Sequence, residues 1–437
     1  MYKFKSTSTW HAKNTGQRLL KIKERIDRND PHLNAVFTQT FFDAAAKQVS
    51  RLNECEGRDL RGAIVSVKDL FDVKGFITKA GTQFMKFDEP AAEDCDVIAR
   101  LREAGAVFIG HTNMTELAYS GLGLNPHYGT PVNALYADCI PGGSTSGGAI
   151  SVACGAADVA IGTDTGGSLR IPAAFNGIVG FKPTQNSVSR EGCKALSQSL
   201  DSVGTMAASV DACKLVYQAI AQSLREPIVD LQPEFIVPTN YGMDDLEPAV
   251  ATGFSEAIEI LRRQGFKVRY ESLNTLHALK TLPVWQFSSI ESRASYDEAY
   301  KTQREIMDPR VASATRMGRA DEVSAIEYRK TLNSRNELIT RFKNEIGTQV
   351  LLMPTVPILP PSFATMESDD EYNRINLQVL RNPSIANVLD CCSISLPFEH
   401  NKITTGVMLT ASGGNDLELL ALAAKVESYF KLPKANH

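Results

Sequence analysis

Two clusters of glycine and serine lie close together within residues 141–184. The first spans residues 142–148 and the second residues 166–168, and an apolar run that ends at Asp164 separates them. Residues with so little side chain expose backbone N–H groups, permit tight turns and let a ligand approach the main chain closely. Each cluster also contains a hydroxyl group. The stretch therefore predicts two loops that form one site, with a nucleophile and the groups that stabilise an anion.

Glycine-rich loops alone also fit other structures. Such loops bind phosphate groups in many proteins, and most glycine pairs in a long chain are simply turns. Neither cluster has the G-x-x-x-x-G-K-[ST] spacing of a phosphate-binding loop, and the lysine of that loop is missing. The G-x-S-x-G nucleophile turn is absent as well. An uncommon serine chemistry remains, with an ordinary structural role for each cluster as the alternative.

Upstream, residues 61–69 form an apolar, β-branched run with a lysine near its end. This composition predicts a buried strand that ends near Lys68. A lysine at a strand end commonly extends its amine to water, which is the structural alternative. A lysine held among apolar neighbours instead has a lowered pKa, because desolvation disfavours the charged amine. The neutral amine can then act as a base.

These three segments together resemble the amidase signature family. The residues that carry the resemblance are Lys68 in VSVKD, Ser144 in PGGSTSGGA and Ser168 in GTDTGGSLRIPAAFNGIVGFKPT, and the spacing of the two serines is that of the family. The resemblance covers nearly the whole chain, from about residue 30 to residue 430, with further agreement at residues 110–116, 199–204 and 353–357.

The resemblance implies a Ser-cisSer-Lys triad. Ser168 is then the nucleophile, Ser144 the bridging serine that follows a cis peptide bond, and Lys68 the base. This assignment is chemically sensible, because a serine hydroxyl is a poor nucleophile until a neighbouring base takes its proton. The family also implies an oxyanion hole built from the backbone N–H groups of Thr165, Gly166, Gly167 and Ser168.

Other positions near the triad are candidates for supporting roles. Asp164 and Arg170 match charged positions of the family, and we expect them to pair and hold the loop, with an exposed pair of little consequence as the alternative. Loop residues near catalytic groups commonly line pockets. The substrate-binding candidates in the loop-rich stretch 113–133 are Met114, Glu116, Tyr119 and Tyr128, with ordinary packing as the alternative for each. The family further implies variable pocket walls, for which the candidates are Trp285, Phe287, Tyr296 and Arg316.

Strand-like and helix-like segments alternate along the chain, which is typical of an α/β fold. Together with the resemblance, this pattern predicts a single large domain over residues 1–437: a mixed, twisted β-sheet of about ten strands sandwiched between layers of α-helices. Within it we expect an N-terminal helical arm (1–60), a catalytic core with the triad (61–230) and a variable half that contributes pocket walls (231–437). Departures from the family pattern occur at Asn176, at residues 186–187 and at residues 387–393.

Bulk properties exclude several function classes. A net charge of −4 gives no basic field for direct nucleic-acid binding or for an anionic membrane surface. The eight cysteines form no C-x-x-C pair and the seven histidines have no ligand spacing, so we expect neither a metal nor another cofactor. No long apolar run and no signal-like N-terminus occur, which predicts a cytoplasmic protein with reduced thiols and no membrane span. A homodimer is compatible with these properties.

The function that the sequence predicts is amide hydrolysis: an amidase that cleaves the C–N bond of a small carboxamide through an acyl-enzyme on Ser168 and releases ammonia or an amine. One alternative is the glutaminase subunit of a tRNA-dependent amidotransferase, which needs partner subunits. A second alternative is a family member that has lost its activity and serves as a scaffold or binding protein.

Overall fold

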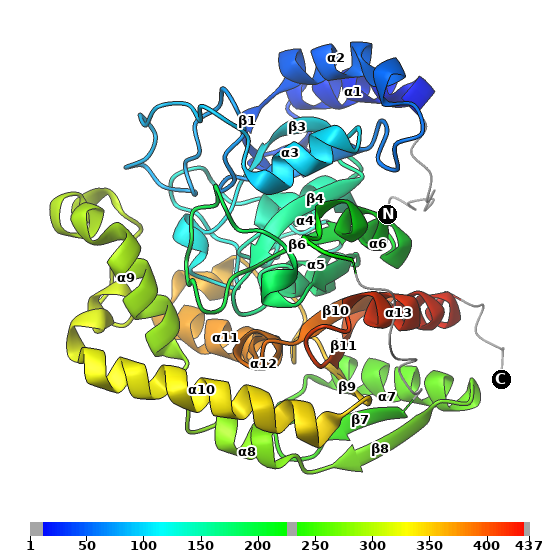
Figure 1. Cartoon of the computed structure of the whole chain (residues 1–437), viewed down its shortest axis with the longest axis vertical. Coiled ribbons are helices and arrows are strands. Elements are labelled where there is room, and N and C mark those ends of the chain that lie inside the picture. The colour runs from blue at the N-terminus through cyan, green and yellow to red at the C-terminus, as the bar shows by residue number, and fades with distance from the viewer. Residues whose placement is uncertain (1–11, 225–233, 432–437) are drawn as a thin grey trace.

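The computed structural model describes residues 12–224 and 234–431, and its centre is one continuous sheet (Figure 1). Eleven strands form this sheet within the described residues, in the order β1-β3-β2-β4-β6-β5-β10-β11-β9-β7-β8. In chain order the strands are β1 (Phe37–Thr40), β2 (Ile64–Lys68), β3 (Val107–Thr112), β4 (Val159–Asp164), β5 (Val179–Lys182), β6 (Ser202–Ala207), β7 (Glu234–Pro238), β8 (Lys267–Glu271), β9 (Val350–Pro354), β10 (Cys392–His400) and β11 (Ile403–Ala411).

Strand directions are mixed, as expected. β2 is parallel to both β3 and β4, and β7 is parallel to both β8 and β9. The strands between these two parallel groups, from β6 to β11, pair antiparallel. The long hairpin of β10 and β11 joins β5 to β9, so strands from both halves of the chain share the sheet. The predicted boundary at 230/231 lies outside the described residues.

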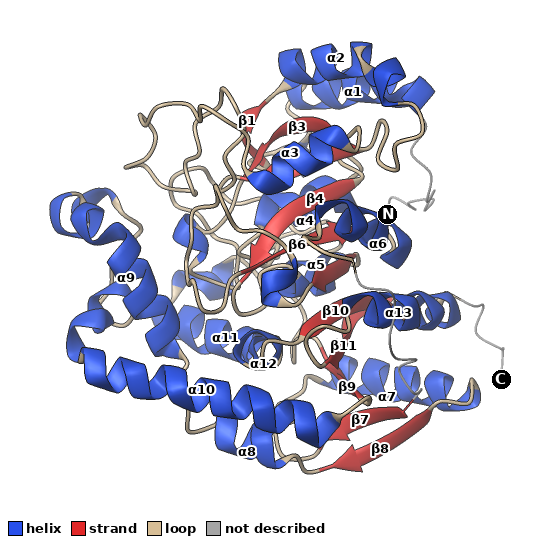
Figure 2. Ribbon diagram, viewed as in Figure 1, coloured by secondary structure: helices blue, strands red, loops and turns tan. Residues whose placement is uncertain are grey.

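Helices cover both faces of the sheet (Figure 2). The α-helices are α1 (Ala12–Asp27), α2 (Phe42–Ser50), α3 (Asp96–Glu103), α4 (Ser146–Ala153), α5 (Arg170–Asn176), α6 (Val210–Ile220), α7 (Pro248–Arg263), α8 (Asn274–Leu279), α9 (Trp285–Thr302), α10 (Ala325–Ile346), α11 (Asp369–Arg381), α12 (Ser384–Val388) and α13 (Asp416–Phe430). The single-domain α/β prediction with a helix-covered mixed sheet is confirmed.

The side chains of β4 show why both faces are buried. Successive residues of a strand point to opposite faces. Val159 and Ile161 belong to a core cluster shared with α3, α6, α7 and α13, whereas Ala160 packs with α4 and α5 on the other face. Every residue of β4 is buried. A strand apolar on both faces is what a sheet between two helical layers requires.

The N-terminal arm differs from its prediction in one respect. The sequence predicts a helical arm, and α1 and α2 form, but β1 lies between them and pairs antiparallel with β3 at the sheet edge. A four-residue strand is too short to show the alternation of apolar and polar residues, and its partner is far away in sequence.

Among the described helices, none combines the length and apolar character needed to cross a bilayer.

Candidate active site

Lys68 is the last residue of β2, the strand that pairs with β3 and β4, and its side chain is fully buried. Its Nζ lies 2.7 Å from Ser144 Oγ and 3.1 Å from Thr163 Oγ1, within hydrogen-bond distance of both hydroxyls. Burial lowers the pKa of Lys68 to about 7, although the carboxylates of Asp201 and Asp164 oppose this shift. Lys68 can therefore exchange a proton with a hydroxyl near neutral pH.

Ser144 lies on the loop that leads into α4, and the peptide bond between Gly143 and Ser144 is cis. The loop packs directly on a second glycine turn, because a Cβ on Gly143 would lie 2.6 Å from the Cα of Gly123. The N–H of Thr115 donates to the Ser144 carbonyl oxygen at 3.1 Å. Close backbone packing thus fixes Ser144 beside the Lys68 amine.

Ser168 lies on the loop between β4 and α5 and lines a cavity of about 510 Å³. The N–H of Thr145 donates to the Ser168 carbonyl oxygen at 3.3 Å, which joins the two serine loops. The Ser168 hydroxyl makes no hydrogen bond to any described residue. The structure therefore brings Lys68 and Ser144 into direct contact and leaves the Ser168 hydroxyl available on the cavity wall.

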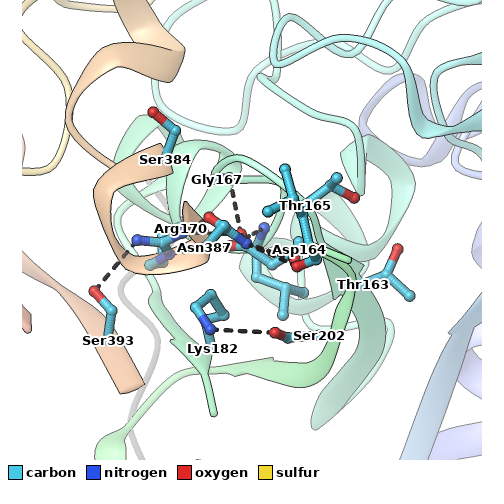
Figure 3. A network of polar contacts seen from close by, with 12 residues as sticks. Thr163, Asp164, Thr165, Gly167, Arg170, Lys182, Ser202, Ser384, Asn387 and Ser393 are labelled. Carbon is cyan, nitrogen blue, oxygen red and sulfur yellow. Dashed lines mark hydrogen bonds and ion pairs between the residues drawn. The ribbon is translucent and has the colours of Figure 1, made fainter. Parts of the chain in front are cut away.

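A buried carboxylate organises the loop that carries Ser168 (Figure 3). Asp164 accepts hydrogen bonds from the backbone N–H groups of Gly167 at 2.8 Å and Leu169 at 3.1 Å. Its oxygens also pair with the Arg170 guanidinium at 2.9 Å, and both side chains are fully buried. Burial raises the pKa of Asp164, but the Arg170 charge and hydrogen bonds outweigh it and lower the pKa to about 2. The expected ion pair is present, in its buried form.

Asn387 on α12 completes this network. Its Nδ2 donates to the Asp164 carbonyl oxygen at 2.8 Å, and its Oδ1 accepts from Arg170 Nη2 at 2.8 Å. Asn387 belongs to the segment 387–393, which departs from the family pattern. In the structure it forms hydrogen bonds to both members of the buried pair.

Removing Arg170 tests how strongly this network holds the loop. We expect Arg170→Met to lower the free energy of unfolding by about 3–5 kcal/mol, because the Asp164 charge would stay buried without a partner. Urea unfolding followed by tryptophan fluorescence measures the change. Arg374→Met, which removes a surface pair with Glu371, is the control and should cost less than about 1 kcal/mol. Equal losses in the two variants would contradict the prediction.

Three of the four expected oxyanion donors are available. The Thr165, Gly166 and Ser168 N–H groups donate to no described residue, whereas the Gly167 N–H is engaged by Asp164. Gly167 has φ +131°, and a Cβ there would lie 2.7 Å from side-chain atoms of Ile171 and Pro383. The backbone conformation and the lack of space both require glycine at this position.

The cavity beside Ser168 receives side chains from distant parts of the chain. Of the candidate substrate contacts, Tyr119, Trp285 and Arg316 line it. Its walls also include Arg319 just after Arg316 and residues of α11 such as Asn376 and Arg381. The walls thus combine aromatic rings with positively charged side chains.

The other substrate-binding candidates from residues 113–133 lie outside this cavity. Met114 is fully buried in the core. Glu116 is buried as well and accepts hydrogen bonds from His127 Nε2 at 2.5 Å and from the Asp308 N–H at 2.9 Å. Tyr128 donates its hydroxyl to the Thr82 carbonyl oxygen at 2.9 Å. These side chains have partners within the protein, as expected if their role is ordinary packing rather than substrate binding.

Two candidate wall residues from the variable half also lie outside the cavity. Phe287 belongs to a buried cluster together with residues of α8 and α10. Tyr296 donates its hydroxyl to the Ala195 carbonyl oxygen at 2.7 Å. Trp285 and Phe287 are two positions apart on one helix and therefore point in different directions.

Sequence reasoning missed two residues that contact the triad region. Thr163 belongs to no recognisable motif, yet it lies one residue before Asp164 and its hydroxyl accepts from Lys68. Asp201 accepts from the Thr165 hydroxyl at 2.6 Å, and burial raises its pKa to about 6. In the sequence, Asp201 belongs to the stretch 199–204 that agrees with the family, but no role was predicted for it.

Within residues 12–224 and 234–431, no group of three histidine, cysteine or acidic side chains could hold a metal ion.

Comparisons with known proteins show which family this chain resembles. The Amidase family model matches residues 18–420. The chain is 32% identical to 2-amino-5-chloromuconic acid deaminase of Comamonas testosteroni, over 96% of this chain and 95% of that protein. It is 35% identical to a subunit of the glutamyl-tRNA(Gln) amidotransferase of Syntrophobacter fumaroxidans, over 59% of this chain and 57% of that protein. A crystal structure of an amidase superposes with a TM-score of 0.82 at 30% identity, over 95% of this chain and 98% of that chain. The chain therefore belongs to the amidase family, and it is an amidohydrolase.

Proposed function

We propose that this amidohydrolase cleaves the C–N bond of a small carboxamide through an acyl-enzyme on Ser168. The observation that carries the proposal is the buried Lys68 amine, which lies 2.7 Å from Ser144 Oγ. The loop that contains Ser144 is hydrogen-bonded to the loop that contains Ser168, and Ser168 lines a cavity. A lysine with a pKa near 7 is matched to proton transfer at neutral pH.

Acylation follows from this arrangement. Ser168 Oγ attacks the amide carbonyl carbon, its proton moves to Ser144 Oγ, and the proton of Ser144 moves to the neutral Lys68 amine. The carbonyl oxygen becomes an oxyanion, for which the unengaged N–H groups of Thr165, Gly166 and Ser168 are the donors. The C–N bond then breaks, and the proton returns along the same route to the leaving nitrogen, which departs as ammonia or an amine.

Deacylation uses the same groups in the same order. Water attacks the ester carbonyl carbon, and its proton passes through Ser144 to Lys68. The bond to Ser168 Oγ then breaks as that oxygen regains a proton, and the carboxylic acid leaves. The relay requires the Ser168 hydroxyl to form a hydrogen bond with Ser144, which a substrate held in the cavity would promote.

The amidotransferase alternative predicts a different dependence on partners. The amidotransferase relative matches only 59% of this chain, whereas the deaminase relative matches 96%. The filled Lys68, Ser144 and Ser168 positions argue against a scaffold that has lost its activity.

We further propose that the protein is cytoplasmic, because all eight cysteines are free thiols. We also propose a homodimer, which a molar mass from light scattering would test.

Ammonia release from a panel of amides tests these functions. The panel contains aliphatic, aromatic, dicarboxylic and ureido amides together with glutamine, and Ser168→Ala serves as the blank. We expect release from one class other than glutamine, which disappears in the variant. Release from glutamine alone, or only after partner subunits are added, would favour the amidotransferase. The absence of any covalent fluorophosphonate adduct and of any release would favour the scaffold.

A further inference from the structure

The cavity beside Ser168 is strongly basic. Three arginines line it, Arg316, Arg319 and Arg381, and no aspartate or glutamate lies among its lining residues in the described parts of the chain. The whole chain carries a net charge of −4, so this concentration of positive charge is local. Apolar walls around fixed charges strengthen their field inside a cleft.

Arg316 is the arginine whose bonding is incomplete. The residue is 8% exposed, and its Nη1 donates to the Tyr119 carbonyl oxygen at 3.3 Å. Its guanidinium lies 5.4 Å from the ring centroid of Tyr372, and no described acidic side chain pairs with it. Its Nη2 is buried without a hydrogen-bond partner in the described structure. A buried charged donor without an acceptor is costly. Because Arg316 lines the cavity, an anion bound there is a partner that its guanidinium group can take.

The other two arginines already have protein partners. Arg319 stacks on Trp285, with its guanidinium carbon 3.5 Å from the ring centroid, and its Nε lies 3.4 Å from Glu322 Oε2. Arg381 Nη2 donates to the Gly242 and Asp244 carbonyl oxygens. These contacts fix the two guanidinium groups at the cavity wall. Arg381 adds positive potential and Arg319 shares its charge with Glu322, whereas Arg316 keeps one donor atom, Nη2, without a partner in the described structure.

We propose that the cavity selects a small amide that carries a carboxylate, and that Arg316 is the residue that binds this carboxylate. This inference rests on the proposed function, because Ser168 must attack the amide end of the same molecule. A carboxylate matches the planar guanidinium group through charge-assisted hydrogen bonds. A volume of about 510 Å³ accommodates such a molecule between Ser168 and the arginines.

Matched substrates separate this proposal from amide hydrolysis in general. Monoamides of straight-chain dicarboxylic acids, such as glutaramate, are compared with neutral amides of equal length, such as pentanamide. We expect kcat/KM for the charged amide to exceed that for its neutral match by about thirtyfold or more. Arg316→Gln should remove this preference, because its loss in kcat/KM for the charged amide should exceed its loss for the neutral amide by about thirtyfold.

Three further variants guard against a folding artefact. Arg374→Gln changes an exposed arginine on α11 that pairs with Glu371 and follows the cavity-lining Asn373, and it should leave both substrates unaffected. Arg316→Lys keeps the positive charge and should retain part of the preference. Arg319→Gln should cause a smaller, several-fold loss for the charged amide only.

Two results would overturn the proposal while amide hydrolysis stands. One is an equal or higher kcat/KM for neutral amides in the wild-type protein. The other is an equal loss for both substrates in a folded Arg316→Gln variant, which would mark Arg316 as structural.

Binding decides the proposal even if no amide is turned over. Calorimetric titration of the Ser168→Ala protein with glutaramate should give a dissociation constant about thirtyfold or more below that for pentanamide, and adding Arg316→Gln should abolish this difference. Such binding without turnover would reject hydrolysis and keep the anion site. Equal binding of both compounds would reject the anion site.

Discussion

Replacing Ser168 with alanine is expected to lower kcat on the preferred amide by a factor on the order of 10⁴ to 10⁶. The hydroxyl lines the cavity and makes no hydrogen bond to a described residue, so its loss removes the proposed nucleophile without breaking a structural contact. Residual turnover would come from binding and from the oxyanion donors alone. Single-turnover and steady-state ammonia release, with mass spectrometry of the fluorophosphonate-treated protein, measure the effect.

Ser288→Ala is the matched control for this loss. Ser288 lines the same cavity from α9, and its hydroxyl donates only to the Trp285 carbonyl oxygen at 3.3 Å. This variant should keep kcat within about a factor of ten of the wild-type value and should still be labelled at Ser168. Ser144→Ala should be severely impaired, and the double Ser144→Ala/Ser168→Ala variant should lose no more than Ser168→Ala alone, because the triad acts as a unit. An active Ser168→Ala enzyme, or a label on another residue, would reject the nucleophile.

Activity is expected to fall as the pH drops through about 7, because only the neutral Lys68 amine can accept a proton. Because burial lowers the pKa of Lys68, the neutral amine is already present near pH 7, and it is lost by protonation at lower pH. One pH unit below the pKa, about a tenth of the amine is neutral, and each further unit removes about another factor of ten. A profile of kcat/KM from pH 5 to pH 9 measures this fall, which is the acidic limb of the profile.

Substitutions at and near Lys68 test whether Lys68 is the group whose protonation causes the acidic limb. Lys68→Ala should lose most of its turnover. Asp201→Asn should move the limb to lower pH, because the Asp201 carboxylate raises the pKa of Lys68. Lys182→Met removes another fully buried lysine, whose Nζ donates to Ser202 Oγ at 3.1 Å, and it should leave a limb near pH 7 in place. A flat profile combined with an active Lys68→Ala enzyme would reject the role as base.

Much of the fold could be predicted from short-range patterns. The apolar run that ends at Lys68 forms β2, and α10 begins at Ala325, where Ser324 and Glu327 make a capping box. These signals are local, since burial periodicity and helix capping depend on residues within a turn or a few positions. The strand β1 lacked such a signal, because only its pairing with β3 makes it a strand.

The substrate-binding residues were much less predictable. Proximity in sequence to catalytic residues suggested Met114 and Tyr128, yet both side chains have partners in the protein interior. Arg381 lines the cavity instead, although it lies more than two hundred residues from Ser168. A pocket wall is defined by which side chains point toward one space, and that direction depends on the packing of whole helices.

The sequence by itself determined which segments make up the candidate site. The glycine-rich loops around Ser144 and Ser168 and the apolar strand before Lys68 are contiguous segments, and their resemblance to the amidase signature family indicates amide hydrolysis. Only the tertiary structure decided how Asn387 braces Asp164 and which arginines surround the substrate cavity. These contacts join segments far apart in the chain, and their formation depends on burial and packing energies summed over the whole domain rather than on any local pattern.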